Sequence, residues 1–142
     1  MTARHDAPAD GSRQLRTAGE AVEAADGTQP VSVKIQLDLP GGVRVGPGKI
    51  RLLELIDSEG SLSRASEAMN ISYRRAWLFV QQINAAFQSP AIATPDHGHG
   101  GAASRLTDFG RELIRHYREI EARTSTHAAD ALDWLRENQR RD

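Results

Sequence analysis

The stretch from residue 60 to residue 87 constrains the fold most, because its pattern predicts two helices joined by a very short turn. Ser61 can cap a first helix over residues 62–69, and Asn70 tolerates the left-handed backbone that ends a helix. Ser72 can then cap a second helix that runs to about Phe87. We expect the first helix to bury Leu62, Ala65, Ala68 and Met69, and the second to bury Ala76, Val80, Ile83 and Phe87.

A third helix is predicted just before this pair. Residues 48–59 place Ile50, Leu53 and Ile56 on one stripe, which Leu52 and Leu55 widen, and Gly60 suits the position after a helix end. Three helices with a tight turn between the last two are the arrangement of a helix-turn-helix. In that motif the final helix enters the major groove of DNA by its N-terminal end.

This arrangement would explain why Tyr73, Arg74 and Arg75 stand in the first turn of the final helix. The planar fork of an arginine can take guanine O6 and N7 together, or it can clamp a phosphate. The alternative is that the paired arginines only form a solvated face, which is the commoner role of such pairs, and three-helix units also occur without DNA. Trp77 is flanked by expected core positions, so we expect it to anchor packing rather than to stack on DNA.

Strands are predicted on both sides of the helices. In residues 31–39 apolar and polar side chains alternate strictly, which puts every apolar side chain on one face of a half-buried strand. The Pro-Gly-Gly sequence at 40–42 supplies a turn, and residues 43–45 can return as a second strand. A second hairpin is predicted from a short apolar segment (91–93), a loop rich in glycine and histidine, and a short strand (105–107). A hairpin in this position is the wing of a winged helix, and its tip can reach the DNA backbone or the minor groove.

The segment from Thr107 to about Gln139 is expected to form one long helix or two consecutive helices. The polar run at 123–127 should weaken the helix between two apolar stripes. The first stripe is Phe109, Leu113, Ile114, Tyr117 and Ile120, and the second is Ala128, Ala129, Ala131, Leu132 and Leu135. We interpret the stripes as a dimer interface, because they exceed what one small core can bury, and the alternative is a C-terminal helix folded back onto its own core.

Composition excludes several classes of protein. The chain has 142 residues, no cysteine and a formal net charge of −1. Disulfides, thiolate metal sites and cysteine nucleophiles are therefore excluded, and the overall charge gives no hint of a polyanionic partner. No apolar run approaches the ~20 residues of a membrane span and no signal peptide is recognisable, so we expect a cytoplasmic protein without membrane contact. Residues 1–30 have almost no large apolar side chain and are expected to be a disordered tail.

Catalytic motifs are not found in the sequence. Nothing resembles a G-x-S-x-G nucleophile elbow, and no Walker or Rossmann glycine pattern occurs. We therefore predict that the protein is not an enzyme and needs no cofactor. His97 and His99 could ligate a metal together with Asp96, but an open loop seldom preorganises such a site. We expect no metal here, and we expect the two histidines to contact the DNA backbone or to remain solvated.

Two stretches resemble a known family. "GSLSRASEAMNISYRRAWLFVQQIN" and "HGHGGAASRLTDFGRELIRHY" are similar to the N-terminal DNA-binding domain of the molybdate-responsive regulators of the ModE family. The resemblance covers about residues 31–123, and it implies a LysR-like winged helix-turn-helix that binds operator DNA as a dimer, linked to molybdenum uptake or use. The shared features are Ile71-Ser72-Tyr73-Arg74 with Ala76-Trp77, the glycine-rich wing, and Leu106-Thr107 followed by Gly110.

The sequence departs from that family in two places. Ala102, Ala103 and Ser104 interrupt a wing that in the family consists almost entirely of glycine. Full-length members also continue into β-rich molybdate-binding modules, whereas this chain ends at Asp142. We therefore expect a stand-alone DNA-binding protein with no molybdate-binding domain in this chain.

The predicted fold is mainly α with small β-hairpins, a winged helix-turn-helix with a long C-terminal dimerisation helix. The expected organisation is a disordered tail over 1–30, the DNA-binding domain over 31–123 and a helical extension over 124–142. The expected partners are double-stranded operator DNA and a second copy of the chain. The alternative is a winged-helix protein-interaction module that does not read DNA sequence. The residues expected to contact DNA are Ser63, Arg64, Ser72, Tyr73, Arg74, Arg75, His97, His99 and Arg105.

Overall fold

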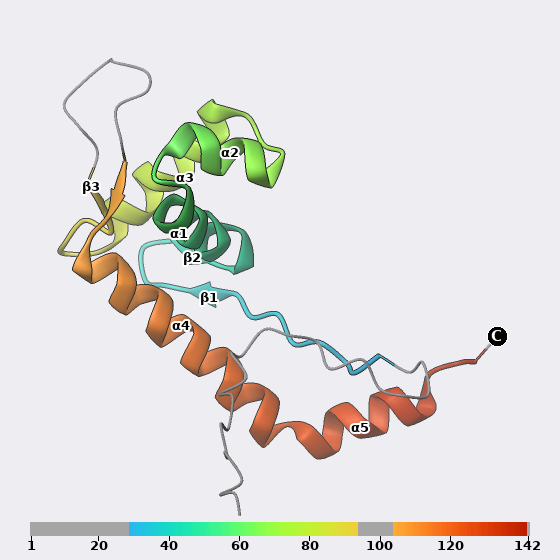
Figure 1. Ribbon diagram of the computed structural model, residues 1–142. Coiled ribbons are helices and arrows are strands. Elements are labelled where there is room, and N and C mark those ends of the chain that lie inside the picture. The colour runs from blue at the N-terminus through green and yellow to red at the C-terminus, as the bar shows by residue number, and fades with distance from the viewer. Residues whose placement is uncertain (1–28, 94–103, 142) are drawn as a thin grey trace, which may run out of the picture. The chain divides into compact units, whose positions relative to one another are not determined.

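A computed structural model describes residues 29–93 and 104–141 of the chain (Figure 1). Over these residues the protein contains five helices and two antiparallel two-stranded hairpins, in the order β1, β2, α1, α2, α3, β3, β4, α4, α5. The prediction of a mainly helical fold with two small hairpins is therefore confirmed. None of the helices in the described ranges is both long and apolar enough to cross a membrane.

The N-terminal hairpin pairs β1 (Leu37–Asp38) with β2 (Arg44–Val45). Gly41 and Gly42 make the predicted turn with φ of +91° and +86°, a conformation that glycine adopts without strain. Burial alternates along residues 33–39 as expected. Only two of the nine predicted strand residues are hydrogen-bonded as a strand, however, because the returning segment ends where α1 begins and is too short to pair with residues 31–36.

Three helices follow, each within one residue of the predicted boundaries: α1 (Pro47–Glu59), α2 (Leu62–Met69) and α3 (Tyr73–Ala86). Gly60 and Asn70 take the left-handed conformation after α1 and α2, with φ of 78° and 56°. The hydroxyls of Ser61 and Ser72 each accept the backbone N–H three residues later at 3.1 Å, which caps α2 and α3. The turn between α2 and α3 is therefore fixed at both ends by local side-chain chemistry.

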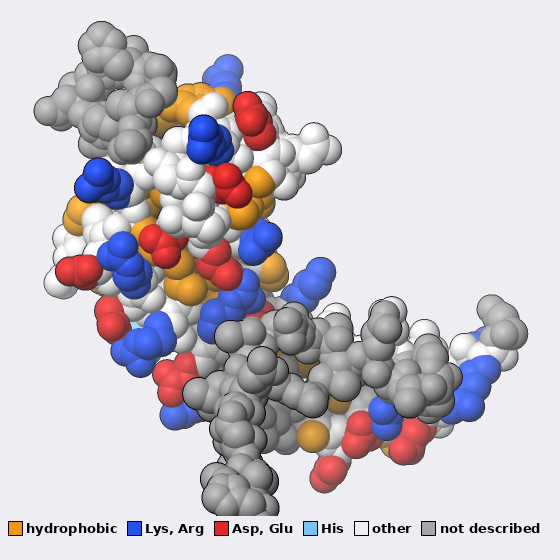
Figure 2. Space-filling model, viewed as in Figure 1, with side chains coloured by type: hydrophobic (Ala, Val, Ile, Leu, Met, Phe, Trp, Pro, Cys, Tyr) orange, Lys and Arg blue, Asp and Glu red, His pale blue; other side chains and the backbone are white. Residues whose placement is uncertain are grey.

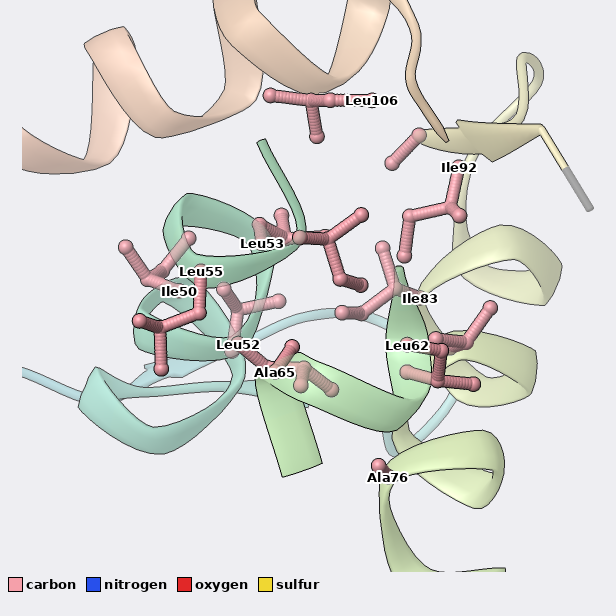
Figure 3. Packing of buried hydrophobic residues seen from close by; sticks show 14 of the residues in the cluster. Ile50, Leu52, Leu53, Leu55, Leu62, Ala65, Ala76, Ile83, Ile92 and Leu106 are labelled. Carbon is pink, nitrogen blue, oxygen red and sulfur yellow. The ribbon is translucent and has the colours of Figure 1, made fainter. Parts of the chain in front are cut away.

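The buried core lies between these three helices and the second hairpin (Figure 3). That hairpin pairs β3 (Ile92–Ala93) with β4 (Arg105–Leu106). Helix α1 supplies the largest share of the core, and Figure 3 shows its side chains meeting those of α2, α3, β3 and β4. The fully packed members are Val45, Ile50, Leu52, Leu53, Leu55, Ile56, Leu62, Ala65, Ala76, Val80, Ile83, Ala91, Ile92, Leu106 and Tyr117.

Two of the expected core positions are wrong. Ala68 is exposed, and Ser66 takes its place on the buried face of α2. Ser66 is tolerated there because its hydroxyl donates to the carbonyl of Ser63 at 2.7 Å. Trp77 is 42% exposed and is not the expected packing anchor, since it follows the buried Ala76 and so lies about 100° further round the helix.

The C-terminal segment consists of two helices, α4 (Asp108–His127) and α5 (Ala129–Asn138). The first half of α4 packs on the core: Tyr117 is fully buried, and Phe109, Leu113 and Ile114 are partly buried against the same cluster. Most of the first apolar stripe is therefore used by the chain's own core, as the alternative interpretation had it. Ile120, Trp134 and Leu135 stay exposed at 43%, 62% and 53%.

Contrary to the prediction, the polar run at 123–127 does not weaken α4, which continues through it to His127. The hydroxyls of Thr124, Ser125 and Thr126 each donate to the carbonyl four residues earlier, so they satisfy themselves on the helix instead of competing with it. The break comes afterwards, at Ala128, where the backbone leaves the helical conformation (φ −95°, ψ 9°).

Candidate nucleic-acid interface

The first turns of α2 and α3 hold most of the residues expected to contact DNA. Ser63 and Arg64 are exposed at the start of α2, and Ser72, Tyr73, Arg74 and Arg75 are exposed at the start of α3. The structure thus places all six at the surface, at the N-terminal ends of two successive helices. The cap uses the Ser72 hydroxyl only as an acceptor, so its O–H can still donate to an anion.

The arginines of these turns differ from the arginines of α4 in their ionic partners. All four α4 arginines form ion pairs with carboxylates: Arg111, Arg115, Arg118 and Arg123. Counting partners only among residues 29–93 and 104–141, no carboxylate pairs with Arg64, Arg74, Arg75 or Arg105. Figure 2 shows acidic and basic side chains interspersed on the face in view. Attraction for a polyanion would therefore come from this local set of arginines rather than from the net charge.

Arg74 and Arg75 are neighbours with different surroundings. The guanidinium carbon of Arg75 lies 5.6 Å from the centre of the Phe79 ring, one turn further along α3. Phe79 is itself partly buried against the core, so this contact holds Arg75 along one flank of the helix. Arg74 projects about 100° away from Arg75 on the helix, toward the face that Leu78 continues.

Exposed apolar side chains are a further feature of α3. Tyr73, Trp77 and Leu78 are 49%, 42% and 44% exposed. Leu78 falls outside the stripe formed by the buried Ala76, Val80 and Ile83, so helical periodicity could have marked it as a surface residue. Large apolar side chains on a groove-binding helix can contact thymine methyl groups.

The β3–β4 hairpin is attached to the end of α3 by one side chain. The amide nitrogen of Asn84 donates to the carbonyl of Ile92 at 3.0 Å. Its side-chain oxygen accepts the backbone N–H groups of Ala91 at 2.9 Å and Ile92 at 3.2 Å. Asn84 thus satisfies three backbone groups where the chain turns from α3 into β3.

Thr107, between β4 and α4, links the two sides of the hairpin base. The hydroxyl of Thr107 accepts the N–H of Gly110 at 3.0 Å and donates to the carbonyl of Pro90 at 2.6 Å. Arg105 is exposed on β4, opposite Ala93. The hairpin therefore has a fixed base beside α3, and it presents Arg105 there.

The two expected histidine contacts, His97 and His99, lie outside the described residues, so their placement stays a prediction. Within the part of the chain that the structure describes, no group of three or more histidine, aspartate or glutamate side chains is gathered as a metal site.

A hollow of about 440 Å³ lies beside α3 and was not anticipated from the sequence. Lys49, in the first turn of α1, is partly buried there; its ammonium donates to the carbonyl of Arg44 at 2.5 Å and lies 5.9 Å from the centre of the Phe79 ring. Burial, and then the charge of Arg44, lower the pKa of Lys49. The hollow is lined by Gly42, Val43, Arg44, Lys49, Gln82 and Ala85.

Several known proteins are similar to this chain over about two-thirds or more of its length, although no protein-family model matches it. The chain is 34% identical over 104 residues, 73% of its length, to the molybdenum transport protein ModE of Azotobacter vinelandii. It is 33% identical over 93 residues, 66% of its length, to the molybdenum-pterin-binding protein MopA of Rhodobacter capsulatus. The chain belongs to the ModE family. The family relationship predicted from the two sequence stretches is therefore confirmed.

The ModE family also includes a relative whose name states DNA binding. The DNA-binding transcriptional dual regulator ModE of Escherichia coli K12 is 29% identical over 100 residues, 70% of this chain. None of the three relatives' names denotes an enzyme. The chain spans 37%, 35% and 38% of the lengths of these three relatives.

Proposed function

We propose that this chain is the DNA-binding part of a transcriptional regulator linked to molybdenum uptake or use, a LysR-like winged helix-turn-helix that binds operator DNA as a dimer. The observation that carries the proposal is the arrangement of α2, a three-residue turn and α3, with Arg74 and Arg75 unpaired by described carboxylates in the first turn of α3. The names of the ModE relatives support the link to transcription and to molybdenum.

In this proposal α3 enters the major groove by its first turn. Arg74 reads a base edge, because no described side chain binds its guanidinium and keeps it away from the groove. Arg75 takes a backbone phosphate, because Phe79 keeps it on the flank of the helix. Ser72 and Tyr73 complete the contacts of α3. Ser63 and Arg64 at the start of α2 bind the backbone on the near side of the groove.

The β3–β4 hairpin acts as the wing. Its base is fixed by Asn84 and Thr107, so Arg105 and the loop that contains His97 and His99 would reach the DNA beside the major-groove contacts. The proposed domain is residues 31–123, and residues 124–142 form the helical extension that contributes to the dimer. Support for the dimer comes from the exposed apolar side chains of α4 and α5.

The test is a comparison of Arg74→Ala and Arg75→Ala on a duplex that the parent protein selects from a random pool. Arg74→Ala should weaken binding to that duplex about tenfold to a hundredfold and relax sequence preference, because a bidentate base contact contributes roughly 1–3 kcal/mol. Arg75→Ala should weaken binding evenly across sequences and reduce the salt dependence by about one charge.

Arg115→Ala is the matched control, since Arg115 is exposed on α4 and already paired with Glu112. Circular dichroism establishes that each variant is folded. If Arg74→Ala and Arg75→Ala both bind the selected duplex as the parent does, the assignment of α3 as the reading helix is wrong. A parent that selects no duplex would favour the protein-interaction module instead.

A further inference from the structure

We propose that the hollow beside α3 is a further phosphate-binding position, in which Lys49 and Arg44 hold one backbone phosphate of the DNA next to the groove that α3 occupies. This inference rests on the proposed function. It adds a contact from α1 and the first hairpin to a surface otherwise formed by α2, α3 and the second hairpin.

The charges around the hollow fit an anion. Of its six lining residues two are basic, one carries a neutral amide and none is acidic. Within the described part of the chain no carboxylate pairs with Lys49. Arg44 has one acidic neighbour, Asp38, with 3.5 Å between Nε and the carboxylate oxygen. Both of those side chains are at least 70% exposed, so the pair is weak and leaves the guanidinium open to a stronger partner.

Lys49 is positioned to donate into the hollow. An ammonium carries three N–H groups, and the carbonyl of Arg44 takes one of them. The other two have no protein acceptor among the described residues and are available to an anion in the hollow that Lys49 lines. The lowered pKa of Lys49 records that burial and Arg44 disfavour its charge in the free protein. A phosphate in the hollow would supply the missing counter-charge and reverse that effect.

The position of the hollow favours a phosphate of DNA over an isolated ion. Arg75 and Lys49 lie beside the same ring, at 5.6 Å and 5.9 Å from the centre of Phe79. One flank of α3 therefore carries a row of cations, which begins with Arg75 in the first turn and ends at the hollow beside Gln82. A row of cations matches a DNA strand, whose charges recur about every 3.4 Å along the helix axis.

The test compares Lys49→Gln with Lys34→Gln, which changes the only other lysine of the chain, an exposed one in the N-terminal extended segment. Lys49→Gln should weaken binding roughly fivefold on the selected duplex and on a scrambled duplex alike, and should lower the slope of log affinity against log salt by about one. Lys34→Gln should match the parent. Lys49→Arg, which keeps the charge, should restore most of the affinity and so separates lost charge from misfolding.

Neutral methylphosphonate groups, placed one at a time along the selected duplex, identify the phosphate. The parent should lose affinity at one position outside the bases that α3 reads, and Lys49→Gln should be indifferent to that replacement alone. If no position loses its effect in Lys49→Gln, the inference is overturned. It is also overturned if orthophosphate without DNA saturates the NMR shifts around Lys49 while the methylphosphonate pattern is the same in both proteins, because the hollow then holds a free oxyanion.

Failure of this inference is distinct from failure of the proposed function. A parent that binds the selected duplex with salt dependence, beside a Lys49→Gln variant that binds as Lys34→Gln does, refutes only the role of the hollow. A parent that binds no duplex refutes the proposed function and this inference with it.

Discussion

Gly110 determines how closely α4 approaches the second hairpin. A Cβ at this position would lie 2.3 Å from the carbonyl oxygen of Ala91 and 2.5 Å from Cδ1 of Leu106. The Leu106 side chain could move, but the backbone oxygen of Ala91 could not move without shifting β3. Glycine is therefore required at this contact, and the hairpin can be seated against α4 only because the first turn of that helix lacks a side chain here.

We expect Gly110→Ala to lower the free energy of unfolding by roughly 1–3 kcal/mol, the usual cost of forcing an extra group into a packed contact. Gly48→Ala is the control, because Gly48 is also helical and a Cβ there meets nothing within 4 Å. That variant should unfold at the same or slightly higher urea concentration, since alanine favours the helix. Urea unfolding followed by circular dichroism measures both, and equal midpoints for the two variants would contradict the contact.

Tyr117 joins the N-terminal extended segment to α4. Its hydroxyl donates to the carbonyl of Ile35 at 2.6 Å, and its side chain is only 1% exposed. Burial, and then the charge of Glu121, raise the pKa of Tyr117, while Arg118 acts in the opposite direction. The folded protein therefore keeps the phenol proton at a pH where the unfolded chain has already released it.

The pH dependence of stability follows from that shift. The contribution of Tyr117 is fully present below about pH 10, the ordinary tyrosine pKa, and is lost as the pH rises from there through the folded-state pKa. Tyr117→Phe should cost roughly 0.5–1.5 kcal/mol at pH 7 through the lost hydrogen bond, and should flatten the alkaline decline. Tyr73→Phe, which removes the same atom from an exposed ring, should leave both unchanged. The measurement is the urea midpoint from pH 7 to about pH 11. If stability falls as steeply at alkaline pH in Tyr117→Phe as in the parent, the explanation is wrong.

At the scale of elements, local chemistry made the helix boundaries predictable. Ser61, Asn70 and Ser72 end or begin helices through bonds to atoms within a few residues, so a sequence reader can place them. The surface position of Arg74 and Arg75 follows from the same boundaries, because it needs only the first residue of α3 and the helical period. Their exposure agrees with the prediction, and their contact with DNA stays a prediction.

The features that the sequence did not predict depend on neighbours far away in the chain. Ser66 rather than Ala68 faces the core because of how α2 is rotated against α1. Its hydroxyl is tolerated there because it bonds to a carbonyl of its own helix. The hollow at Lys49 needs α1, the first hairpin and α3 together, and no spacing in the sequence reports that meeting. The interpretation of the first apolar stripe of α4 as free surface was wrong for the same reason, because that stripe packs against parts of the chain far away in sequence.

Helix α4 is held to the core more firmly than its apolar stripe indicated. Arg118 donates to Glu54 of α1 and to Glu121 of α4, with all three side chains no more than about one-third exposed. Together with Tyr117 this contact explains why the first stripe packs within the chain instead of remaining free. A contact between two copies, if it uses this segment, would therefore lie after Tyr117, the last fully buried residue of α4.

For the whole molecule, large apolar side chains are exposed at two places that matter here, on α3 and on the second half of α4 with α5. Helix α5 has no buried residue. Its Trp134 and Leu135 are more exposed than any side chain of the first stripe. We propose that these residues and Ile120 form the contact between two copies, which would set two α3 helices in successive major grooves about 34 Å apart on a near-palindromic operator.

Trp134→Ser combined with Leu135→Ser tests this assembly without adding charge. Leu113 and Tyr117 cannot serve, because both pack in the core of one chain and their loss would disturb folding.

The double variant should raise the dimer dissociation constant at least about a hundredfold, since a buried Trp or Leu side chain contributes roughly 1.5–3 kcal/mol and each copy supplies both. Its melting behaviour as a monomer and its affinity for a single half-site should match the parent, because neither side chain is part of the core or near α3. Affinity for the palindrome should fall to that of the half-site. Light scattering at micromolar concentration and titration of both duplexes measure the two effects. A parent that is monomeric and still prefers the palindrome would show that α5 has another purpose.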